Sequence, residues 1–598
     1  MKNVTRKTFI KQAISLSSLL VLNPSWSKSR TIGLLNTDTS FFKETDIYIR
    51  VVAANTKEVD KLMGVLSKDI TDLARTLGFD FANLASAYAE PTSKYYQQAD
   101  LIPLMAKIMR FLLKEQNTDG TLNLGNFESA PDTAFILEPI CAAISILNEN
   151  KTTVFDEVKA LSKQFILKAA DALTTGGIHT PNHRWVVSAA LAQINTLYPN
   201  PKYVRRIDEW LSETIFIDTE GHYLERSMIY SEIIDKSLIT MSRHLKRPEL
   251  LAPVRKNLSM VYYYIEPNGD IVTTDSRRQD QFMEKKALPF YIDYRYMAIA
   301  DNNGEYADVA LLLENVKGFD EEVLSQSLFW FLEEPLFKKP LPPVRPLPTR
   351  FEKFFKETNL VRFRRDSQTA TIFGGTDLPL IIGSGRSTSP NLFAFRKGDA
   401  VLKHLRLSSD FFSTGFFRSK GIVKEGNAYV LRQKLEVPYY QPLPNDKKRK
   451  DGDYKHTPSV DGRFWNKMDF ENRPLSNVKT LESKITIQEK NGGFELVFDI
   501  SGTDDENVTI ELCFKEGGSV TNIKAFDDQP DNFFLDKGRG TYQSGKDTIT
   551  FGNGTMTHRR VKNIDGEMYT SHFGSLRTQG IHVYLTGKTP FKHTLTIS

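Results

Sequence analysis

The chain has 598 residues and a mass of 68.1 kDa, with 40% hydrophobic and 25% charged residues. This composition excludes a disordered or collagen-like chain and allows several globular domains. The two cysteines, Cys141 and Cys513, exclude a disulfide framework and a cysteine-based zinc ribbon. The formal net charge is +5, but four of the positive charges lie in the first 27 residues, so the nearly neutral remainder does not indicate nucleic-acid binding.

Residues 1–27 have the pattern of an export signal. Basic residues precede the apolar stretch Ala13–Leu22, which is too short to span a bilayer, and a small-x-small cleavage site follows at residues 25–27. The sequence around Arg6-Lys7 resembles a twin-arginine signal with lysine as its second residue. We therefore expect a periplasmic or secreted protein without a membrane span. The alternative is a frayed amphipathic N-terminal helix.

From about Thr56 to Glu334, apolar residues recur at i, i+3, i+4 and i+7, with short polar breaks between the periodic segments. This pattern predicts an array of helical hairpins, which we assign to residues 28–337. The predicted helices are Leu101–Glu115, Ala134–Leu147, Val154–Leu173, Trp185–Leu197, Met228–Leu245, Glu249–Ile265, Pro289–Ala300 and Glu321–Leu332.

Residues 338–350 are rich in proline, which excludes a helix or an inner strand and predicts a stiff linker. In residues 351–598 the alternation has a period of two, and glycine-rich turns separate short strands, which predicts an antiparallel β-sandwich. Asn491-Gly492-Gly493 is expected to be a hairpin turn, and residues 444–473 a long polar loop. The predicted strands are Ala370–Phe373, Leu378–Ile382, Ala394–Phe395, Lys484–Gln488, Phe494–Ile500, Val508–Phe514, Thr548–Phe551 and Val583–Thr586.

Asn182-His183 is the first candidate site and lies in the loop before a predicted helix. Pro181 holds the residue before it away from helical geometry, and such loops commonly carry catalytic groups. Capping of the helix is an alternative role for Asn182. Trp185 could stack on a sugar ring or pack in a core.

A second candidate is a polar face formed if residues 223–230 are helical. Tyr223, Arg226, Ser227 and Tyr230 would then share one side, at i, i+3, i+4 and i+7. Two phenols, a guanidinium and a hydroxyl suit a polar cleft better than an apolar core. An ordinary amphipathic helix with outward tyrosine hydroxyls remains the alternative.

Several further polar residues could contact a substrate. Arg278, which follows Arg277, suits a carboxylate or sulfate, although a salt-bridged loop would explain the pair equally well. Asn126 and Asp132 could bind sugar, while capping also explains Asp132. His404 could reach the site from the sandwich or serve as a structural histidine. The Tyr439-Tyr440 pair and the basic run Lys447–Lys450 could contact a polyanionic glycan, or could be core and solvated surface respectively.

These residue types fit the abstraction of a weakly acidic proton beside a sugar carboxylate. Negative charge then develops on the carboxylate oxygens, so the reaction needs donors such as an Asn amide, a His or an Arg. It also needs a base for the carbon and an acid for the leaving oxygen. A tyrosine can exchange protons if a nearby cation stabilises its phenolate.

Asn182-His183 followed by Glu225-x-Ser227-x-x-Tyr230 resembles the heparinase II/III-type and alginate-type polysaccharide lyases. The resemblance implies an N-terminal (α/α) toroid of helical hairpins followed by a C-terminal antiparallel β-sandwich. It also implies cleavage of a uronic-acid-containing glycan by β-elimination. It implies that Asn182 neutralises the substrate carboxylate, that His183 is a neutraliser or base, and that Tyr230 is the acid, or both acid and base.

Members of this group also hold a metal in the sandwich. Here His404, Asp410 and His456 lack convincing ligand spacing. We predict no metal ligand and no cofactor, and leave a divalent metal in the sandwich open. The expected partner is an acidic polysaccharide or oligosaccharide, and the oligomeric state stays open.

Two other functions remain open at this stage. A glycoside hydrolase of the unsaturated-uronide type would need two carboxyl groups facing the scissile bond, and Asp132, Glu225 and Asp275 are the candidates. A non-catalytic glycan-binding surface protein is the other alternative.

Overall fold

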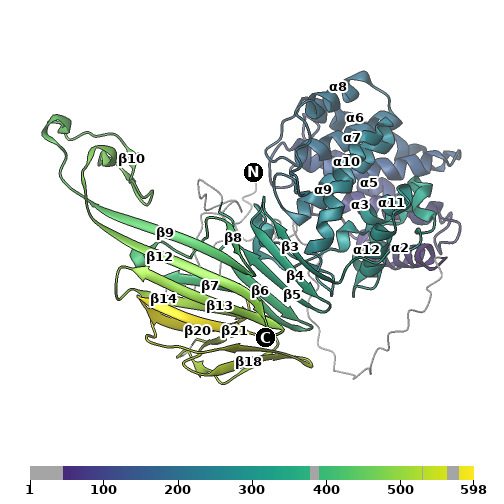
Figure 1. The fold of residues 1–598 in the computed structure, drawn as a ribbon. Helices are drawn as coiled ribbons and strands as arrows, with labels where there is room; N and C mark the ends of the chain where they lie inside the picture. The colour runs from purple at the N-terminus through teal and green to yellow at the C-terminus, as the bar shows by residue number, and fades with distance from the viewer. Residues whose placement is uncertain (1–44, 377–388, 528, 562–577) are drawn as a thin grey trace. The chain divides into compact units, whose positions relative to one another are not determined.

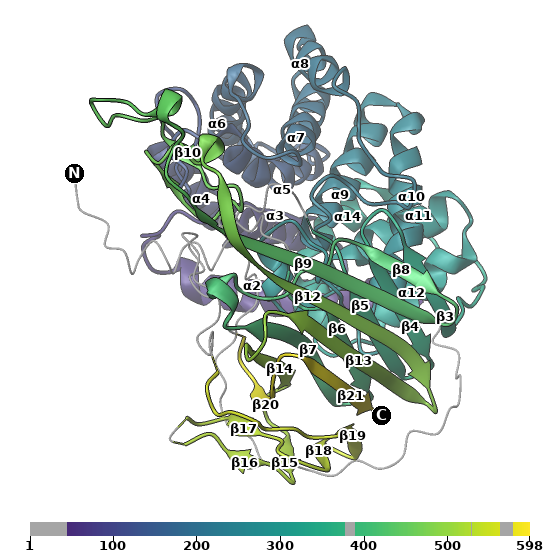
Figure 2. The same ribbon diagram turned by 60° about the vertical axis from the view of Figure 1, so that its left-hand side comes forward.

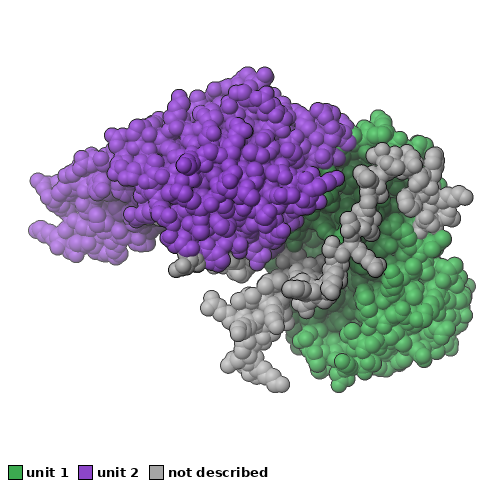
Figure 3. Space-filling model, turned by 90° about the horizontal axis from the view of Figure 1, so that it is seen from below, with its two compact units in different colours: residues 1–272, 284–347 green, residues 273–283, 348–598 purple. Residues whose placement is uncertain are grey.

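The computed structural model describes residues 45–376, 389–527, 529–561 and 578–598. It divides into two units (Figure 3). Unit 1 comprises Met1–Val272 and Glu284–Leu347, and unit 2 comprises Thr273–Met283 and Pro348–Ser598. The segment 273–283 therefore groups with the sandwich, although it lies inside the range 28–337 that we assign to the helical array. The predicted signal at residues 1–27 and the predicted strand Leu378–Ile382 lie outside the described residues.

Unit 1 is built from helices (Figure 1). They are α2 (Thr45–Leu66), α3 (Thr76–Ala89), α4 (Leu101–Glu115), α5 (Ala130–Asn148), α6 (Asp156–Thr175), α7 (His183–Leu197), α8 (Pro201–Leu211), α9 (Met228–Leu245), α10 (Leu251–Val261), α11 (Tyr291–Ala300), α12 (Gly304–Glu314), α13 (Phe319–Glu322) and α14 (Leu328–Glu333). A two-stranded ladder pairs β1 (Asp270–Ile271) with β2 (Lys285–Lys286).

The helices form hairpins with an inner and an outer row, the (α/α) toroid that the resemblance implies. Inner helices α3, α5, α7 and α9 pack side by side in chain order, while α4, α6 and α8 form the outer row (Figures 1 and 2). The inner helix α5 is buried on nearly all sides, which explains why it is apolar all round. The outer helix α8 buries only Tyr203 and Ile207, so its pattern is strongly amphipathic.

Within the part of unit 1 that the structure describes, one helix is long and apolar enough to cross a membrane. This helix is α5, and 83% of its most apolar window is buried inside the structure. Burial of this extent is typical of a core helix in a folded domain.

Unit 2 contains the remaining strands. They are β3 (Arg350–Phe355), β4 (Leu360–Arg365), β5 (Gln368–Phe373), β6 (Phe393–Lys397), β7 (Ala400–Ser409), β8 (Ile422–Glu425), β9 (Ala428–Tyr440), β10 (Thr457–Pro458), β11 (Trp465–Asn466), β12 (Leu475–Lys490), β13 (Gly493–Gly502), β14 (Asn507–Phe514), β15 (Ser519–Thr521), β16 (Lys524–Ala525), β17 (Asn532–Phe534), β18 (Arg539–Ser544), β19 (Asp547–Gly552), β20 (Ile581–Lys588) and β21 (Phe591–Ile597).

These strands form the predicted sandwich. An eight-stranded sheet has the order β15-β18-β19-β21-β13-β12-β9-β8, and a nine-stranded sheet has the order β16-β17-β20-β14-β7-β6-β5-β4-β3. Pairing is antiparallel except between β17 and β20, which run parallel. This exception arises because the chain leaves β17 for β18 and β19 of the other sheet before it returns through β20.

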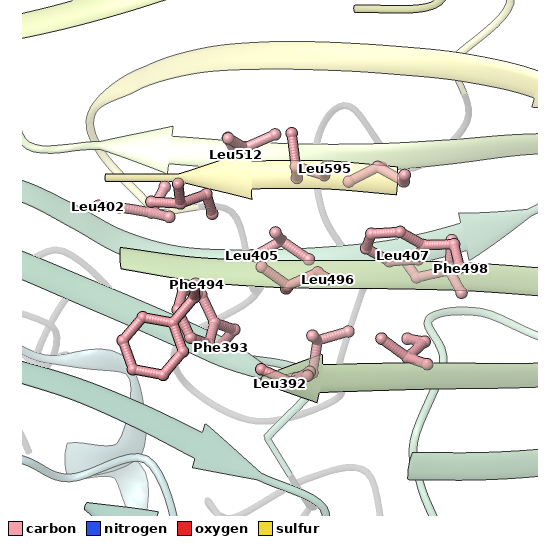
Figure 4. Close-up of a cluster of buried hydrophobic side chains, with 14 of the residues drawn as sticks. Leu392, Phe393, Leu402, Leu405, Leu407, Phe494, Leu496, Phe498, Leu512 and Leu595 are labelled. Atoms are coloured by element: carbon pink, nitrogen blue, oxygen red, sulfur yellow. The ribbon is translucent and has the colours of Figure 1, made fainter. Parts of the chain in front are cut away.

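The core of unit 2 lies between its two sheets. Leu405 of β7 and Leu512 of β14 come from one sheet, and Leu496 of β13 and Leu595 of β21 come from the other (Figure 4). Phe494, Leu496, Phe498 and Ile500 alternate along β13, as the period of two requires. Between β12 and β13, Asn491 and Gly492 both have positive φ, at 52° and 74°, so the predicted hairpin turn is confirmed.

Candidate functional site

The N-termini of the inner helices meet at one rim of unit 1. A hydrogen bond joins Asn182, just before α7, to Glu225, just before α9. An ion pair joins Arg75, just before α3, to Asp132 in the first turn of α5. Because a helix N-terminus carries partial positive charge, this rim favours an anion.

Asn182 occupies the N-cap position of α7, but its side chain does not cap the helix. Its Nδ2 instead donates to Glu225 Oε2 at 2.8 Å, and its backbone N–H donates to the same oxygen at 3.3 Å. A second Nδ2 contact reaches Thr180 Oγ1 at 3.3 Å. Asn182 is fully buried, and its Oδ1 has no hydrogen-bond partner among the described residues. The contact with Glu225 therefore fixes which way the amide points.

His183 is the first residue of α7 and is 8% exposed. Its ring lies edge-to-face against His179, with centroids 4.7 Å apart, and against Phe135 of α5, with centroids 6.4 Å apart. Two rings from different segments therefore hold the imidazole beside the Asn182 amide.

The helix that carries Tyr230 begins at Met228, as the apolar period predicts, and does not extend back to Tyr223. Ser227 is the N-cap of α9, with an extended backbone, and its Oγ accepts the Tyr230 N–H at 3.3 Å. Arg226 has a φ of 50°, which a right-handed helix does not allow. The expectation that Tyr223 and Arg226 share a helical face with Tyr230 is therefore wrong, because the chain turns at Arg226 before the helix starts.

Tyr230 itself lies in the first turn of α9 and is half-buried. Arg226 is also half-buried, and its N–H donates to the Tyr223 carbonyl in the preceding turn. Both side chains therefore belong to the segment that the Asn182–Glu225 contact holds against the start of α7.

Tyr223 is placed in the interior. Only 3% of it is exposed, and its hydroxyl donates to Asp235 Oδ1 of α9 at 2.7 Å. Burial, together with the nearby Asp235 carboxyl, raises the pKa of Tyr223 well above its usual value. The Tyr223–Asp235 hydrogen bond therefore joins the segment before α9 to the side of that helix.

Asp132 and Asn126 form a third part of the rim. Asn126 is exposed, and its Nδ2 donates to Asp132 Oδ2 at 2.8 Å. Burial acts to raise the pKa of Asp132, but the Arg75 charge and the hydrogen bonds with Asn126, Arg75 and Ser129 lower it overall. Asp132 is therefore an ionised, paired carboxylate, and such a group is poorly suited to act as a general acid.

The sequence pattern does not identify Arg75 as a residue of the rim. Its guanidinium lies 4.2 Å from the centre of the Phe135 ring, and Phe135 in turn contacts His183. No local motif marks Arg75, because its partners lie far along the chain and come together only in the folded hairpins.

The other predicted site residues lie elsewhere. Trp185 is 2% exposed, with Arg184 stacked over its ring at 4.8 Å, so its ring packs in the core. Arg278 belongs to unit 2, where its Nε donates to Gln279 Oε1 at 3.3 Å. His404 lies in β7 of unit 2 and is 1% exposed, with Nε2 3.3 Å from Thr578 Oγ1. Burial and neighbouring cations hold the pKa of His404 well below its usual value.

The sequence leaves a metal in the sandwich open, with His404, Asp410 and His456 as the residues to consider. No group of three or more His, Cys, Asp or Glu side chains in the described ranges could hold a metal ion. Asp410 instead accepts from Asn507 at 2.9 Å, and the ring of His456 lies beside Trp465.

No family model matches the chain, and no curated protein matches its sequence. Solved structures match its fold. Heparinase III has a TM-score of 0.50 and 14% identity, and the match covers 89% of this chain and 76% of that one. Chondroitin AC lyase of Streptomyces coelicolor A3, solved with chondroitin sulphate, has a TM-score of 0.53 and 11% identity over 99% and 82% of the two chains.

A xanthan lyase of Paenibacillus has a TM-score of 0.55 and 10% identity, and the match covers 93% of this chain and 57% of that one. The chain therefore has the fold of these polysaccharide lyases, as the resemblance in its sequence implies.

Proposed function

We propose that this protein is a polysaccharide lyase that cleaves a uronic-acid-containing glycan by β-elimination and leaves a 4,5-unsaturated uronate end. The observation that carries the proposal is the Asn182–Glu225 hydrogen bond. It ties an amide and an imidazole at the start of α7 to the segment whose next helical turn carries a phenol. β-Elimination needs a group that neutralises the substrate carboxylate, a base that takes the carbon proton and an acid that protonates the leaving oxygen. Side chains of these three types can supply those roles.

The negative charge of the substrate would be neutralised at the start of α7. The Nδ2 group of Asn182 gives one hydrogen to Glu225, while its second hydrogen makes only a long 3.3 Å contact with Thr180. With the amide held by Glu225, a uronate carboxylate would accept that hydrogen in place of Thr180. The N-terminal ends of the inner helices would add positive potential, and a ring N–H of His183 could donate to the carboxylate.

Tyr230 would move the protons. Its position in the first turn of α9 leaves it half-buried, so that it is accessible to a substrate but held by the helix. If Tyr230 starts as a neutral phenol, it would protonate the leaving oxygen while neutral His183 takes the proton from the carbon beside the carboxylate. If Tyr230 starts as a phenolate, it would take that proton itself and pass it to the leaving oxygen.

The substrate, by the same proposal, is an acidic polysaccharide outside the cytoplasm. Three of the solved proteins with this fold are a heparinase, a chondroitin lyase and a xanthan lyase, which supports a polysaccharide substrate. The export signal predicted at residues 1–27 accords with this location, and export is part of the proposal.

Absorbance at about 230–235 nm tests the proposal, because the elimination creates a double bond conjugated with the carboxylate. The purified protein is mixed with chondroitin sulfate, heparan sulfate, xanthan and alginate. A rise with at least one polymer supports a lyase. New reducing ends without the absorbance rise would indicate a hydrolase and contradict the proposal.

Tyr230→Phe is the matching variant. It should lower turnover by ~10²–10⁴, the usual share of acid–base catalysis, and leave the unfolding transition unchanged. Tyr96→Phe, which changes a 39% exposed tyrosine elsewhere in unit 1, is the control and should retain full turnover. Equal turnover by both variants would remove Tyr230 from the mechanism.

A further inference from the structure

A second feature of the molecule lies in unit 2, between β9 and β12. These long strands pair as far as Tyr440 and Leu475, and residues 441–474, which we call the arm, continue beyond them. The arm contains the short ladder of β10 with β11 and projects from the sandwich, at the upper left in Figure 1. The ladder gives the arm a defined backbone where the sequence predicts only a long loop.

Exposed apolar side chains are concentrated on the arm and the strand ends that carry it. Trp465 is the most exposed of the aromatic ones there, at 63%, and Phe464 and Tyr439 are each 51% exposed. An exposed patch of this kind on a folded domain marks a binding surface. The exposed large apolar side chains of this region are Tyr439, Val460, Phe464, Trp465, Met468, Leu475 and Val478.

A row of rings joins the arm to the sandwich, with Phe464 from the arm, Tyr439 from the end of β9 and Phe412 from the turn Phe411–Ser413. The Arg463 guanidinium lies over two of them, 5.2 Å from the centre of the Phe412 ring and 4.8 Å from that of Phe464. The Phe412 ring in turn contacts Tyr439, with centroids 6.2 Å apart. An ion pair between Arg463 and Asp461 holds the guanidinium in place at 2.6 Å. The row is therefore preorganised.

Trp465 has different neighbours from this row. Its ring lies 5.9 Å from that of His456, and it pairs across the ladder with Pro458. Phe464 directly precedes β11, and its carbonyl accepts the Ser459 N–H at 2.7 Å, so the ladder pairing continues to it. Because successive residues of an extended strand point to opposite faces, we infer that Phe464 and Trp465 place rings on both sides of the arm.

The arm also carries an excess of positive charge. Residues 441–474 contain eight Lys and Arg against six Asp and Glu. Some of the acidic residues form ion pairs within the arm, such as Asp451 with Arg449 at 2.8 Å. Lys450 and Lys455 are exposed, and neither has a hydrogen-bond or ion-pair partner within the described part of the chain.

We propose that the arm of unit 2 is a binding surface for an acidic glycan chain, built from residues other than those of the rim of unit 1. The rings would stack on pyranose faces, and Lys450 and Lys455 would meet carboxylate or sulfate groups. The proposal rests on the proposed function for the class of glycan. A flat lipid surface fits less well, because a membrane-binding element presents its apolar side chains on one face.

Affinity electrophoresis through gels containing chondroitin sulfate, heparan sulfate, xanthan or alginate tests the arm. The variants are Phe464→Ala/Trp465→Ala and Lys450→Gln/Lys455→Gln. Their controls are Val423→Ala, an equally exposed apolar residue of β8, and Lys420→Gln, an exposed lysine outside the arm. Each lost ring should weaken polymer binding about three- to tenfold. The lysine variant should bind more weakly at low salt only, and both controls should bind like the wild type.

Equal retention of all variants and controls would overturn the proposal. The proposal would also be overturned if the arm variants bound the glycans normally but lost binding to anionic phosphatidylserine vesicles, which would indicate a membrane surface. A changed sedimentation coefficient with normal glycan binding would indicate contact with a second copy of the chain and would overturn it too. The side chains of Phe464 and Trp465 are exposed, so their replacement should not unfold the protein. An unchanged unfolding transition checks that the variants are folded. If the arm variants are retained less by a polymer that the protein does not cleave, and no other polymer is cleaved, the proposed lyase activity is contradicted and the binding role of the arm is supported. If a polymer is cleaved and the arm variants are retained like the wild type, the lyase activity is supported and the binding role of the arm is contradicted.

Discussion

At the residue scale, a carboxylate 43 positions away along the chain sets the orientation of the Asn182 amide. Glu225 is 5% exposed and accepts both the side-chain and backbone N–H groups of Asn182. A buried N–H without a partner costs more than the average hydrogen bond contributes. Glu225 therefore acts on the proposed chemistry through Asn182, as a positioning residue.

Glu225→Ala should destabilise the fold by about 1–3 kcal/mol, because it leaves the buried Asn182 donors without their acceptor. It should also lower turnover, while Glu225→Gln, which can still accept a hydrogen bond, should restore part of both. Urea unfolding and the absorbance assay measure the two effects. Glu213→Ala, which removes an exposed ion pair with Arg184, is the control and should cost no more than about 1 kcal/mol. A Glu225→Ala variant as stable as this control would contradict the argument.

The sequence marks Asn182, His183 and Tyr230 as candidates, and the fold brings their segments to one rim. It does not reveal Arg75 or the orientation of Asn182. Each depends on a partner far along the chain, which residue types and spacing alone do not identify.

At the scale of elements, the start of α9 decides where Tyr230 lies. Ser227 accepts the Tyr230 N–H, so the serine defines the first turn that holds the phenol. The apolar period finds this helix at its true bounds, Met228–Leu245, as it finds α4. It does not find α8, although Asn200-Pro201 is a recognisable N-cap followed by a proline at the first position. Capping residues at a helix end can therefore identify a helix that the spacing of its apolar residues does not reveal.

Ser227→Ala should cost about 1 kcal/mol of stability through loss of the cap. Because the same bond fixes the first turn of α9, turnover should fall more than this small loss of stability alone would explain. Ser227→Thr, which retains a capping hydroxyl, should recover both properties. Thermal unfolding and the absorbance assay report them. Ser212→Ala, which changes an exposed serine at the end of α8, is the comparison. If Ser227→Ala and Ser212→Ala behave alike, the cap does not position Tyr230.

At the scale of the whole molecule, the change of period near the proline-rich segment separates helical from β-rich sequence, and both architectures follow from it. The grouping of residues 273–283 with unit 2 does not. That segment has no strong period, and only contacts distant in sequence decide which unit it joins. The parallel pairing of β17 with β20 has the same origin, since register between strands far apart in the chain leaves no local pattern.

The stability of unit 2 should also depend on pH through a buried histidine. Burial acts to lower the pKa of His582, but hydrogen bonds with Cys513 and Glu511 raise it to about 9. His582 Nδ1 lies 2.7 Å from Glu511 Oε1, and Nε2 lies 3.7 Å from Cys513 Sγ. Since the unfolded value is about 6.5, the folded state binds this proton more tightly. Its contribution is therefore complete below about pH 6.5 and disappears as the pH rises through 9.

A shift of this size corresponds to about 3 kcal/mol of unfolding free energy lost between pH 6.5 and about 9.5. Urea unfolding across this range, followed by a signal of the β-rich unit, measures the loss. Glu511→Gln removes the carboxylate that favours the imidazolium, so its stability should be lower at pH 6.5 and should vary less with pH. Parallel pH profiles for the wild type and Glu511→Gln would show that the His582–Glu511 pair does not hold the proton in the folded protein.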